Sequence, residues 1–301
     1  MIFRRYPESI QNVNDNFIVH FTAESSELSR HTTPLTLKCS MKGLEKFYTP
    51  ERTYGVNPGN FLILNEGQQC ESLIENSSES FSIYFNPEFA GSALKSLITP
   101  SDKMLNFSFK KISQPVTFFE KLYPHNNYLS PVLMKMRLAS KINFDDENWL
   151  KERYFELLEN LLKLHRDLYK EIEKLPPVKL STKTELYRRV SIAKEYIDLE
   201  FTDNLTLKKI SGEACLSQFH FLRIFKSVYK QTPHQYLTKK RIEKATELLK
   251  RTDMPVTGIC FEIGFESVST FSLMFKSKFG LSPETFRESY RRHMTKFKFS
   301  K

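Results

Sequence analysis

The last third of the chain contains one segment twice. Shifted by 50 residues, SQFHFLRIFKSVYKQTPHQY (217–236) aligns without a gap on SVSTFSLMFKSKFGLSPETF (267–286). The aromatic residues coincide, as do the Phe-Lys-Ser triplet of each copy and the prolines near its end, Pro233 and Pro283. Such self-similarity is the signature of a duplicated structural unit. It restricts this part of the chain to two copies of one small motif.

Each copy has the pattern of a short helix, a turn and a second helix. Ser217 and Ser267 stand where a side-chain cap would begin the second helix. We therefore expect helix-turn-helix motifs at about 206–229 and 255–279, because a second helix with basic residues is typical of this motif. The residues between them, 233–251, predict one connecting helix.

The second helix of each copy has two different sides. At about 100° per residue, phenylalanines and other apolar residues gather on one side, which we interpret as core. The core side comprises Phe221, Ile224, Phe225 and Val228 in the first copy and Phe271, Met274 and Phe275 in the second. The opposite side comprises Phe219, Leu222, Arg223, Lys226 and Ser227 in the first copy and Ser269, Ser272, Leu273, Lys276 and Ser277 in the second. Any binding function belongs to the opposite side.

The composition of the opposite sides suits DNA. Arg223 can make a bidentate contact with guanine, Phe219 and Leu222 suit thymine methyl groups, and Ser269 and Ser272 permit close approach. Phosphate contacts are expected from basic residues and from the two caps: Ser217, Lys226, Lys230, Lys239, Lys240, Arg241, Ser267 and Lys276. For each lysine the alternative is an ordinary solvated helix face.

The connecting helix sets the distance between the two motifs. About 19 helical residues at 1.5 Å each span roughly 28 Å, whereas successive turns of one major-groove face lie about 34 Å apart. A stiff spacer of this length holds the two second helices near neighbouring turns on one side of a duplex. One chain is therefore expected to read a site of roughly two turns of DNA, with bending of that site as one outcome.

The net charge of +10 lies entirely in the C-terminal part of the sequence. Residues 1–180 contain 22 Lys and Arg against 22 Asp and Glu, and residues 181–301 contain 23 against 13. A basic domain beside a neutral one indicates that the C-terminal part meets a polyanion, either nucleic acid or a membrane surface. The sequence has no apolar run near 18 residues and no secretion signal, so we expect a cytoplasmic protein that does not span a membrane.

The N-terminal part has the alternating pattern of β-strands. Leu35, Leu37, Cys39 and Met41 alternate with polar residues, and similar short runs follow up to about residue 90. Turn-forming sequences separate the runs, which predicts an antiparallel sandwich or barrel. The four cysteines are far apart and form no C-x-x-C, so neither a zinc site nor a disulfide framework is indicated.

A long helix with a heptad-like seam follows the strands, at 148–174. Its apolar positions are Leu150, Tyr154, Leu157, Leu161, Leu164 and Leu168. We expect this seam to pair with its copy in a homodimer, because it runs over more than three heptads with charged flanks. The alternative is that the seam packs on its own sheet domain. Pro176 and Pro177 end the helix and begin a linker at 176–184.

Residues 185–292 resemble the DNA-binding domain of the AraC/XylS family of bacterial transcription regulators. The strongest signature is IGFESVSTFSLMFKSKFGLSPETFR, and LTLKKISGEACLSQFHFLRIFKSVYKQTPHQYL follows the corresponding family segment. The resemblance implies a seven-helix domain with two helix-turn-helix motifs joined by a long helix. By position, it places the family's base-reading residues at Phe219, Leu222, Arg223, Val268, Ser269, Ser272 and Leu273.

Two positions depart from the family pattern. Leu273 stands where the second helix of many relatives has arginine, so the second copy is expected to read guanine weakly and to act mainly in positioning. Cys215 stands where the first turn often has glycine, and a left-handed conformation at that residue would cost about 1 kcal/mol.

The N-terminal part resembles, more loosely, the cupin-like sensor of the same family over residues 55–89. Its loop GQQCES lacks the histidines that hold a metal in enzymatic cupins, so we expect no metal, no cofactor and no catalytic residue. The predicted fold class is α+β with two domains. The first is a cupin-like antiparallel β-barrel at 1–147 with a dimerisation helix at 148–175. The second is an all-α domain with two helix-turn-helix motifs at 185–292, followed by a basic tail at 293–301.

Three functions are compared. The leading hypothesis is a ligand-responsive transcriptional regulator that binds double-stranded promoter DNA as a homodimer and contacts RNA polymerase. The alternative is a DNA-binding regulator whose N-terminal domain binds a protein partner and no small-molecule effector. The third, an enzyme built on the cupin-like domain, lacks metal ligands and a nucleophile motif.

Overall fold

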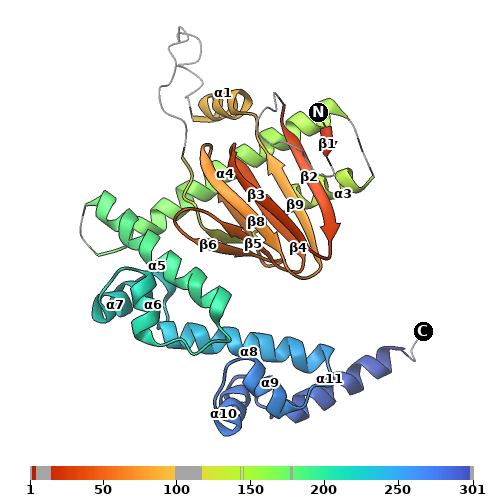
Figure 1. Cartoon of the computed structure of the whole chain (residues 1–301), viewed down its shortest axis with the longest axis vertical. Coiled ribbons are helices and arrows are strands. Elements are labelled where there is room, and N and C mark those ends of the chain that lie inside the picture. Colours follow the sequence, from red (N-terminus) through yellow and green to blue (C-terminus); the bar gives the residue numbers. More distant parts are fainter. Residues whose placement is uncertain are drawn as a thin grey trace. The chain divides into compact units, whose positions relative to one another are not determined.

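The computed structural model of the chain describes residues 2–4, 15–98, 117–142, 144, 146–176 and 179–298 (Figure 1). The chain divides into two compact units, Met1–Lys174 and Leu175–Lys301, which we call the sheet unit and the helical unit. No helix within the described ranges is both long enough and apolar enough to cross a membrane.

The sheet unit contains two β-sheets. Its strands are β1 (Ile2–Arg4), β2 (Phe17–Ala23), β3 (Ser26–Thr33), β4 (Thr36–Lys42), β5 (Glu45–Tyr48), β6 (Thr53–Val56), β7 (Asn60–Leu64), β8 (Gln68–Ile74), β9 (Ser78–Tyr84) and β10 (Leu122–Pro124). One sheet has six strands in the order β1-β2-β9-β4-β7-β10, and the other has four in the order β3-β8-β5-β6. The pairing is antiparallel except between β1 and β2, which run parallel.

The two sheets face one another across a shared core and do not close into a barrel. Phe47 and Tyr54 of the four-stranded sheet share a buried cluster with Leu62 and Leu64 of the six-stranded sheet. Both edge strands of the four-stranded sheet, β3 and β6, pair only within that sheet among the described strands. The antiparallel sheet domain that the sequence predicts is therefore confirmed, but the described strands form an open two-layer structure and no closed barrel.

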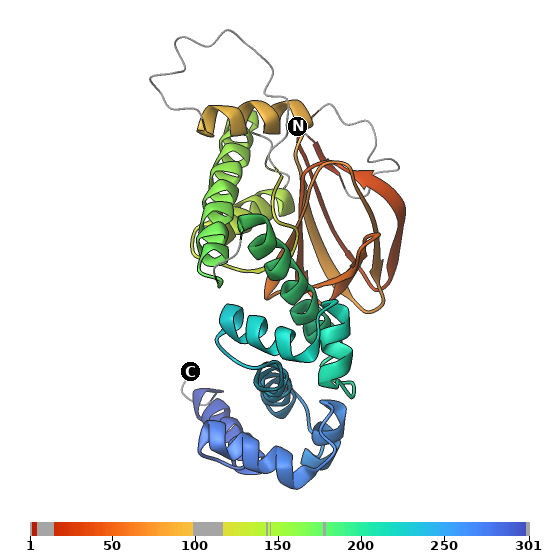
Figure 2. The ribbon, with the colours of Figure 1, turned by 90° about the vertical axis from the view of Figure 1, so that its left-hand side faces the viewer.

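The two faces of β4 show where each layer lies. Leu37 and Cys39 share a fully buried face, as the alternation predicts. The other face carries Lys38, whose ammonium group lies over the Phe47 ring and so points into the space between the sheets. The apolar face of β4 must then point the other way, where helices α3 (Leu129–Lys141) and α4 (Glu147–Glu173) lie against the six-stranded sheet (Figure 2). Helix α1 (Pro87–Ile98) packs on α4 at one end of this layer.

Helix α4 buries its apolar seam inside its own unit. Of the seam residues, Leu150, Tyr154, Leu157, Leu161 and Leu168 are buried, and Leu164 is partly exposed. The Tyr154 ring contacts Phe85 and Phe89 edge-to-face. The prediction that this seam pairs with a second copy is therefore wrong, because enclosed side chains leave no apolar stripe for a partner. The alternative, packing on its own domain, is what the structure has.

The helical unit is built of seven described helices. They are α5 (Leu180–Glu200), α6 (Leu207–Glu213), α7 (Gln218–Tyr229), α8 (Pro233–Arg251), α9 (Val256–Glu262), α10 (Val268–Phe279) and α11 (Pro283–Lys298). α5 begins inside the predicted linker, and α11 continues past residue 292 into the predicted basic tail. A capping box starts α8, since the Thr232 hydroxyl accepts from the backbone of Gln235 and the Gln235 side chain accepts from the backbone of Thr232.

Both copies of the repeat fold into a short helix, a turn and a longer helix. α6 and α7 form the first copy, and α9 and α10 form the second. The predicted caps are confirmed: the Ser217 hydroxyl accepts from the backbone N–H of His220, and the Ser267 hydroxyl accepts from that of Thr270.

The two turns differ in one structural detail. Cys215 has φ 48° and Gly264 has φ 83°, so both residues have the left-handed conformation. Ile210 of α6 and Ile259 of α9 occupy the buried position of the short helix, an offset of 49 instead of 50. The second turn is therefore one residue longer than the first, which the gapless alignment of the longer helices does not show.

Candidate nucleic-acid interface

The outer face of α7 exposes an aromatic ring and a free arginine. Buried Phe221 and Phe225 fix how the helix is rotated about its axis. On the opposite side the Phe219 ring is 80% exposed, Leu222 is partly exposed, and Arg223 is exposed. We call these three residues the first exposed face. No described residue forms an ion pair or hydrogen bond with the Arg223 guanidinium, so its donors are available to a ligand.

Helix α10 also turns one face away from its core, as α7 does, but the residues on this face differ in chemistry from those on α7. Phe271 and Phe275 are fully buried and hold the helix on its core. Four residues make up the second exposed face: Val268, Ser269, Ser272 and Leu273. Ser269 is exposed, Val268 and Ser272 are partly exposed, and Leu273 is 71% exposed at the position equivalent to Arg223. This face offers hydroxyl groups and apolar surface but no positive charge.

A single large apolar side chain stands in solvent on each face. Phe219 and Leu273 are among the most exposed large apolar residues of the described chain. Isolated exposed apolar residues are common on protein surfaces. Here each one lies beside the capped N-terminal half of a helix whose other side is core. Apolar groups in this position can contact thymine methyl groups in a major groove.

The structure separates the predicted phosphate ligands into two groups. Lys226, Lys239 and Lys276 are exposed and form no ion pair with a described residue. Lys230 is exposed in a left-handed conformation and donates to the carbonyl of Ser227. Ser217 and Ser267 are exposed caps. Lys226, Lys239 and Lys276 are therefore free to meet a phosphate, whereas Lys230, Ser217 and Ser267 are exposed but already hydrogen-bonded within their own helix ends.

Lys240 belongs to the other group, because it pairs with a shielded carboxylate. Its ammonium lies 2.9 Å from Asp198, which also accepts from Lys194 at 2.5 Å and from the Tyr236 hydroxyl at 2.7 Å. Burial raises the pKa of Asp198, but Lys194 and Lys240 outweigh burial and hold that pKa below its ordinary value. This ion pair joins α8 to α5, and the phosphate contact predicted for Lys240, which stays a prediction, would have to compete with it.

Arg241 is also occupied inside the helical unit. Its Nε donates to the carbonyl of Phe201 at 2.8 Å and its Nη2 donates to that of Asp203 at 2.7 Å. The guanidinium also lies over the Phe265 ring, 5.6 Å from its centroid. Two of its nitrogens thus donate to backbone carbonyls, and the phosphate contact predicted for Arg241 stays a prediction.

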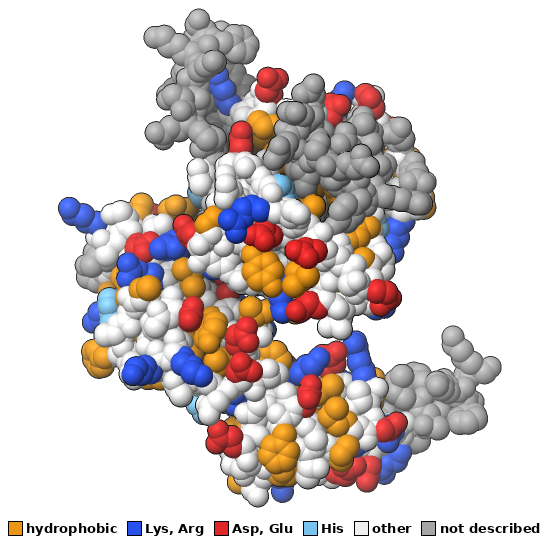
Figure 3. All heavy atoms as spheres, viewed as in Figure 1, with side chains coloured by type: hydrophobic (Ala, Val, Ile, Leu, Met, Phe, Trp, Pro, Cys, Tyr) orange, Lys and Arg blue, Asp and Glu red, His pale blue; other side chains and the backbone are white. Residues whose placement is uncertain are grey.

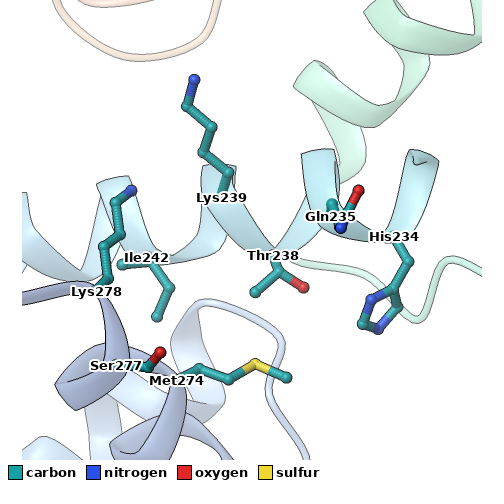
Figure 4. Close-up of a pocket in the computed structure, with 8 residues that line it drawn as sticks. All are labelled: His234, Gln235, Thr238, Lys239, Ile242, Met274, Ser277 and Lys278. Atoms are coloured by element: carbon teal, nitrogen blue, oxygen red, sulfur yellow. The ribbon is translucent and has the colours of Figure 1, made fainter. Parts of the chain in front are cut away.

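A groove of about 420 Å³ lies between α8 and α10, and no sequence pattern predicts it (Figure 4). Its lining residues are His234, Gln235, Thr238, Lys239, Ile242, Met274, Ser277 and Lys278. No carboxylate is among them, and two are lysines. The end of α8 that follows α7 and the side of α10 next to its exposed face thus border one concave, positively charged surface.

At least one face of the helical unit has no continuous patch of positive charge. Figure 3 shows a face on which Lys and Arg side chains alternate with acidic and apolar ones. Within the described ranges, no cluster of three or more His, Cys, Asp or Glu residues is arranged to hold a metal ion. The chemistry that the helical unit offers is hydrogen bonding, positive charge and apolar contact.

Comparison with known proteins agrees with this geometry. A family model described as "Helix-turn-helix domain" matches residues 210–289, which include most of both copies of the repeat. "Probable transcriptional regulator LumQ" of Photobacterium leiognathi is 33% identical over 92 residues, 31% of this chain and 37% of LumQ. "Probable transcription factor PqrA" of Proteus vulgaris is 32% identical over 91 residues, 30% of this chain and 75% of PqrA.

A solved structure is also similar to the helical part. The DNA-binding domain of AdpA, in complex with a target DNA, is 27% identical, covers 36% of this chain and 94% of that domain, and superposes with a TM-score of 0.32. The matches to LumQ and two other regulators span 37%, 28% and 27% of those relatives' own lengths.

The duplicated helix pairs and the match to the helix-turn-helix family model define a protein of the helix-turn-helix class. The chain belongs to the AraC/XylS family of DNA-binding transcriptional regulators.

Proposed function

We propose that this chain regulates transcription by binding double-stranded promoter DNA through its helical unit. The observation that carries the proposal is the pair of capped helices, α7 and α10, each with a buried phenylalanine side and an exposed face without acidic residues. Each helix pair then works as a helix-turn-helix, with α7 and α10 in successive major-groove segments. α8 has 19 residues and spans roughly 28 Å between them.

The two exposed faces are proposed to read bases unequally. Arg223 would pair with guanine, with Phe219 and Leu222 against thymine methyl groups. The second exposed face has no arginine, so Ser269, Ser272 and Leu273 would give weaker preferences and would mainly place α10 in its groove. A selection of bound sequences from random DNA tests this directly: the half-site under α7 should be more restricted than the half-site under α10.

Phosphate contacts are proposed from the free cations and caps. Lys226 and Lys276 occupy equivalent positions on α7 and α10, and Lys230 and Lys239 lie near the start of α8. Ser217 and Ser267 lie at helix N-termini, where phosphate binding is favourable. The groove between α8 and α10 adds Lys278 to this set, and its position between the two helices suits the sugar–phosphate backbone that separates two major-groove segments.

The sheet unit is proposed to be a cupin-like sensor that binds a small polar effector. The support is a polar core: Lys38 is 1% exposed and donates a hydrogen bond to the Tyr84 hydroxyl, and Glu45 is 3% exposed. One carboxylate oxygen of Glu45 has no hydrogen-bond partner among the described residues. A buried polar atom without a partner calls for an explanation, and an effector that supplies a donor is one.

We expect at least one compound of a panel of polar metabolites to raise the melting temperature of the full chain, because a ligand that binds only the folded state stabilises it. Replacement of Lys38 by methionine should remove that shift while the protein stays folded by circular dichroism. An absence of any shift across the panel would favour the alternative, in which this unit binds a protein partner.

No catalytic role is proposed for either unit. Contact with RNA polymerase and a cytoplasmic location are proposed from the family resemblance alone.

A homodimer is proposed through α3 in place of the enclosed seam of α4. Met134, Leu138 and Ile142 follow one another at a spacing of four, and they are 44%, 55% and 74% exposed. Such an apolar stripe on a helix is a surface that a second copy can cover. Light scattering at micromolar concentration should give a dimer for the natural chain and a monomer for Leu138→Glu, with Lys135→Glu on the same helix as the control. A monomeric natural chain would remove this proposal.

A further inference from the structure

The helical unit has two separate hydrophobic cores. The first contains α5, α6 and α7 together with Tyr236 and Leu237 of α8. The second contains α9 and α10 together with Ile242, Ala245 and Leu249 of α8. Helix α8 contributes side chains to both cores, and the boundary between the two cores along α8 falls between Leu237 and Ile242. The position of α7 relative to α10 therefore depends on α8 and on any other contact that bridges the cores.

The side chain of Arg241, at the boundary between the two cores on α8, contacts both of them. Arg241 donates two hydrogen bonds to the loop that follows α5, at the carbonyls of Phe201 and Asp203. Phe201 packs on the first core. The same guanidinium lies over the ring of Phe265, which is part of the second core. A planar guanidinium suits this double task because it donates in its plane and stacks through its face.

The turn of the second copy rests directly on the same loop. A Cβ atom placed on Gly264 would lie only 2.3 Å from the carbonyl oxygen of Thr202, so the two backbones touch. Beside this contact, the Asn204 side chain donates to a carboxylate oxygen of Glu266 at 3.2 Å. We call residues 201–204, Arg241 and residues 264–266 the inter-core clasp, because they join the two cores of the helical unit.

We propose that the inter-core clasp fixes the offset between α7 and α10, and thereby the spacing between the two DNA contacts that the chain accepts. The proposal rests on the function proposed above and names Arg241 as a positioning residue. A single helix fixes a distance but can bend and twist along its length. A second attachment away from its axis removes that freedom. One added base pair shifts and rotates a half-site by about 3.4 Å and about 35°, so a rigid pair of helices should reject it.

The first test measures binding to a spacing series. Starting from the best selected site, one base pair is inserted or removed between the two half-sites, and each duplex is titrated with the full chain. We expect the natural chain to lose about tenfold or more in affinity on either change, within the range of one mismatched contact. Arg241→Ala should reduce that loss to about threefold or less, because its two helices adapt. Arg251→Ala is the control, since Arg251 is on the same helix and pairs only with Glu247 among the described residues.

Arg241→Lys separates positioning from simple charge. Lysine keeps the positive charge but offers no planar fork, so it can satisfy one carbonyl of the loop and not both. If Arg241 positions α10, this variant should also lose spacing discrimination. If Arg241 instead contacted a phosphate, Arg241→Lys would keep the discrimination of the natural chain, and the proposal would be overturned.

The second test needs no DNA. Spin labels at Lys226→Cys and Lys276→Cys, in a chain that also carries Cys215→Gly to remove the one exposed cysteine of the described residues, report the distance between equivalent points of α7 and α10. The distance distribution should be narrow, and Arg241→Ala should broaden it while helix content is unchanged. Equal widths in both proteins would overturn the clasp. A narrow distribution in the labelled chain, together with no specific DNA binding by the natural chain, would instead contradict the proposed function and leave the clasp supported.

Discussion

Replacing Arg223 with alanine is expected to weaken specific DNA binding by roughly 1 to 3 kcal/mol and to relax one base preference. The reason is that Arg223 is the one arginine on either exposed face and has no partner in the described structure. The measurement is a titration of natural and Arg223→Ala chains against the selected site and against the same site with each guanine replaced. Loss of affinity should be largest where the natural chain requires guanine.

Lys226→Ala is the matched control for Arg223→Ala. Lys226 lies one helical turn along α7 and is equally free of ion pairs among described residues, but we assign it to phosphate. Its removal should weaken binding to all sequences alike and reduce the slope of log affinity against log salt by about 1. If Arg223→Ala behaves in the same way, or binds the selected site normally, the assignment of the first exposed face is wrong.

Replacing Gly264 with alanine is expected to lower the free energy of unfolding of the helical unit by roughly 2 to 4 kcal/mol. Two effects add: an alanine at φ 83° is strained, and its Cβ would lie 2.3 Å from the Thr202 carbonyl oxygen. The backbone of the turn would have to move off the loop after α5. Urea unfolding followed by circular dichroism measures the change, and a loss below about 0.5 kcal/mol would show that the turn does not rest on this loop.

Cys215→Gly is the matched change in the first turn and should have the opposite sign. Cys215 is left-handed at φ 48°, so glycine relieves strain and should raise the free energy of unfolding by about 1 kcal/mol. The pair of variants thus tests whether the two turns of the repeat share a backbone conformation. Destabilisation by Cys215→Gly would contradict that conclusion.

The helical unit could be predicted in some detail from the sequence because its signals are local. The repeat placed both long helices, and the caps Ser217 and Ser267 were identified from their position before a periodic apolar segment. Local sequence patterns could not show which Lys and Arg side chains form ion pairs or hydrogen bonds with distant parts of the chain. Lys240 and Arg241 looked like further members of a basic run, whereas Asp198 and the carbonyls of residues 201 and 203 occupy them.

The sheet unit was harder to predict because its signals depend on packing. An apolar seam such as that of α4 indicates that something covers it, but the covering surface, here Phe85 and Phe89 among others, comes from distant parts of the sequence. Alternation in β4 likewise indicated two faces without telling which one meets the second sheet. The groove between α8 and α10 had no signal at all, since its residues come from helices 40 positions apart and share no motif.

The central claim is that one chain reads two successive turns of DNA with two unequal helices. Hydroxyl-radical footprinting of the full chain on its selected site tests this most directly. We predict two protected segments on one face of the duplex, about one helical turn apart, with the stricter base requirement under α7. A single protected segment, or two segments on opposite faces of the duplex, would contradict the account.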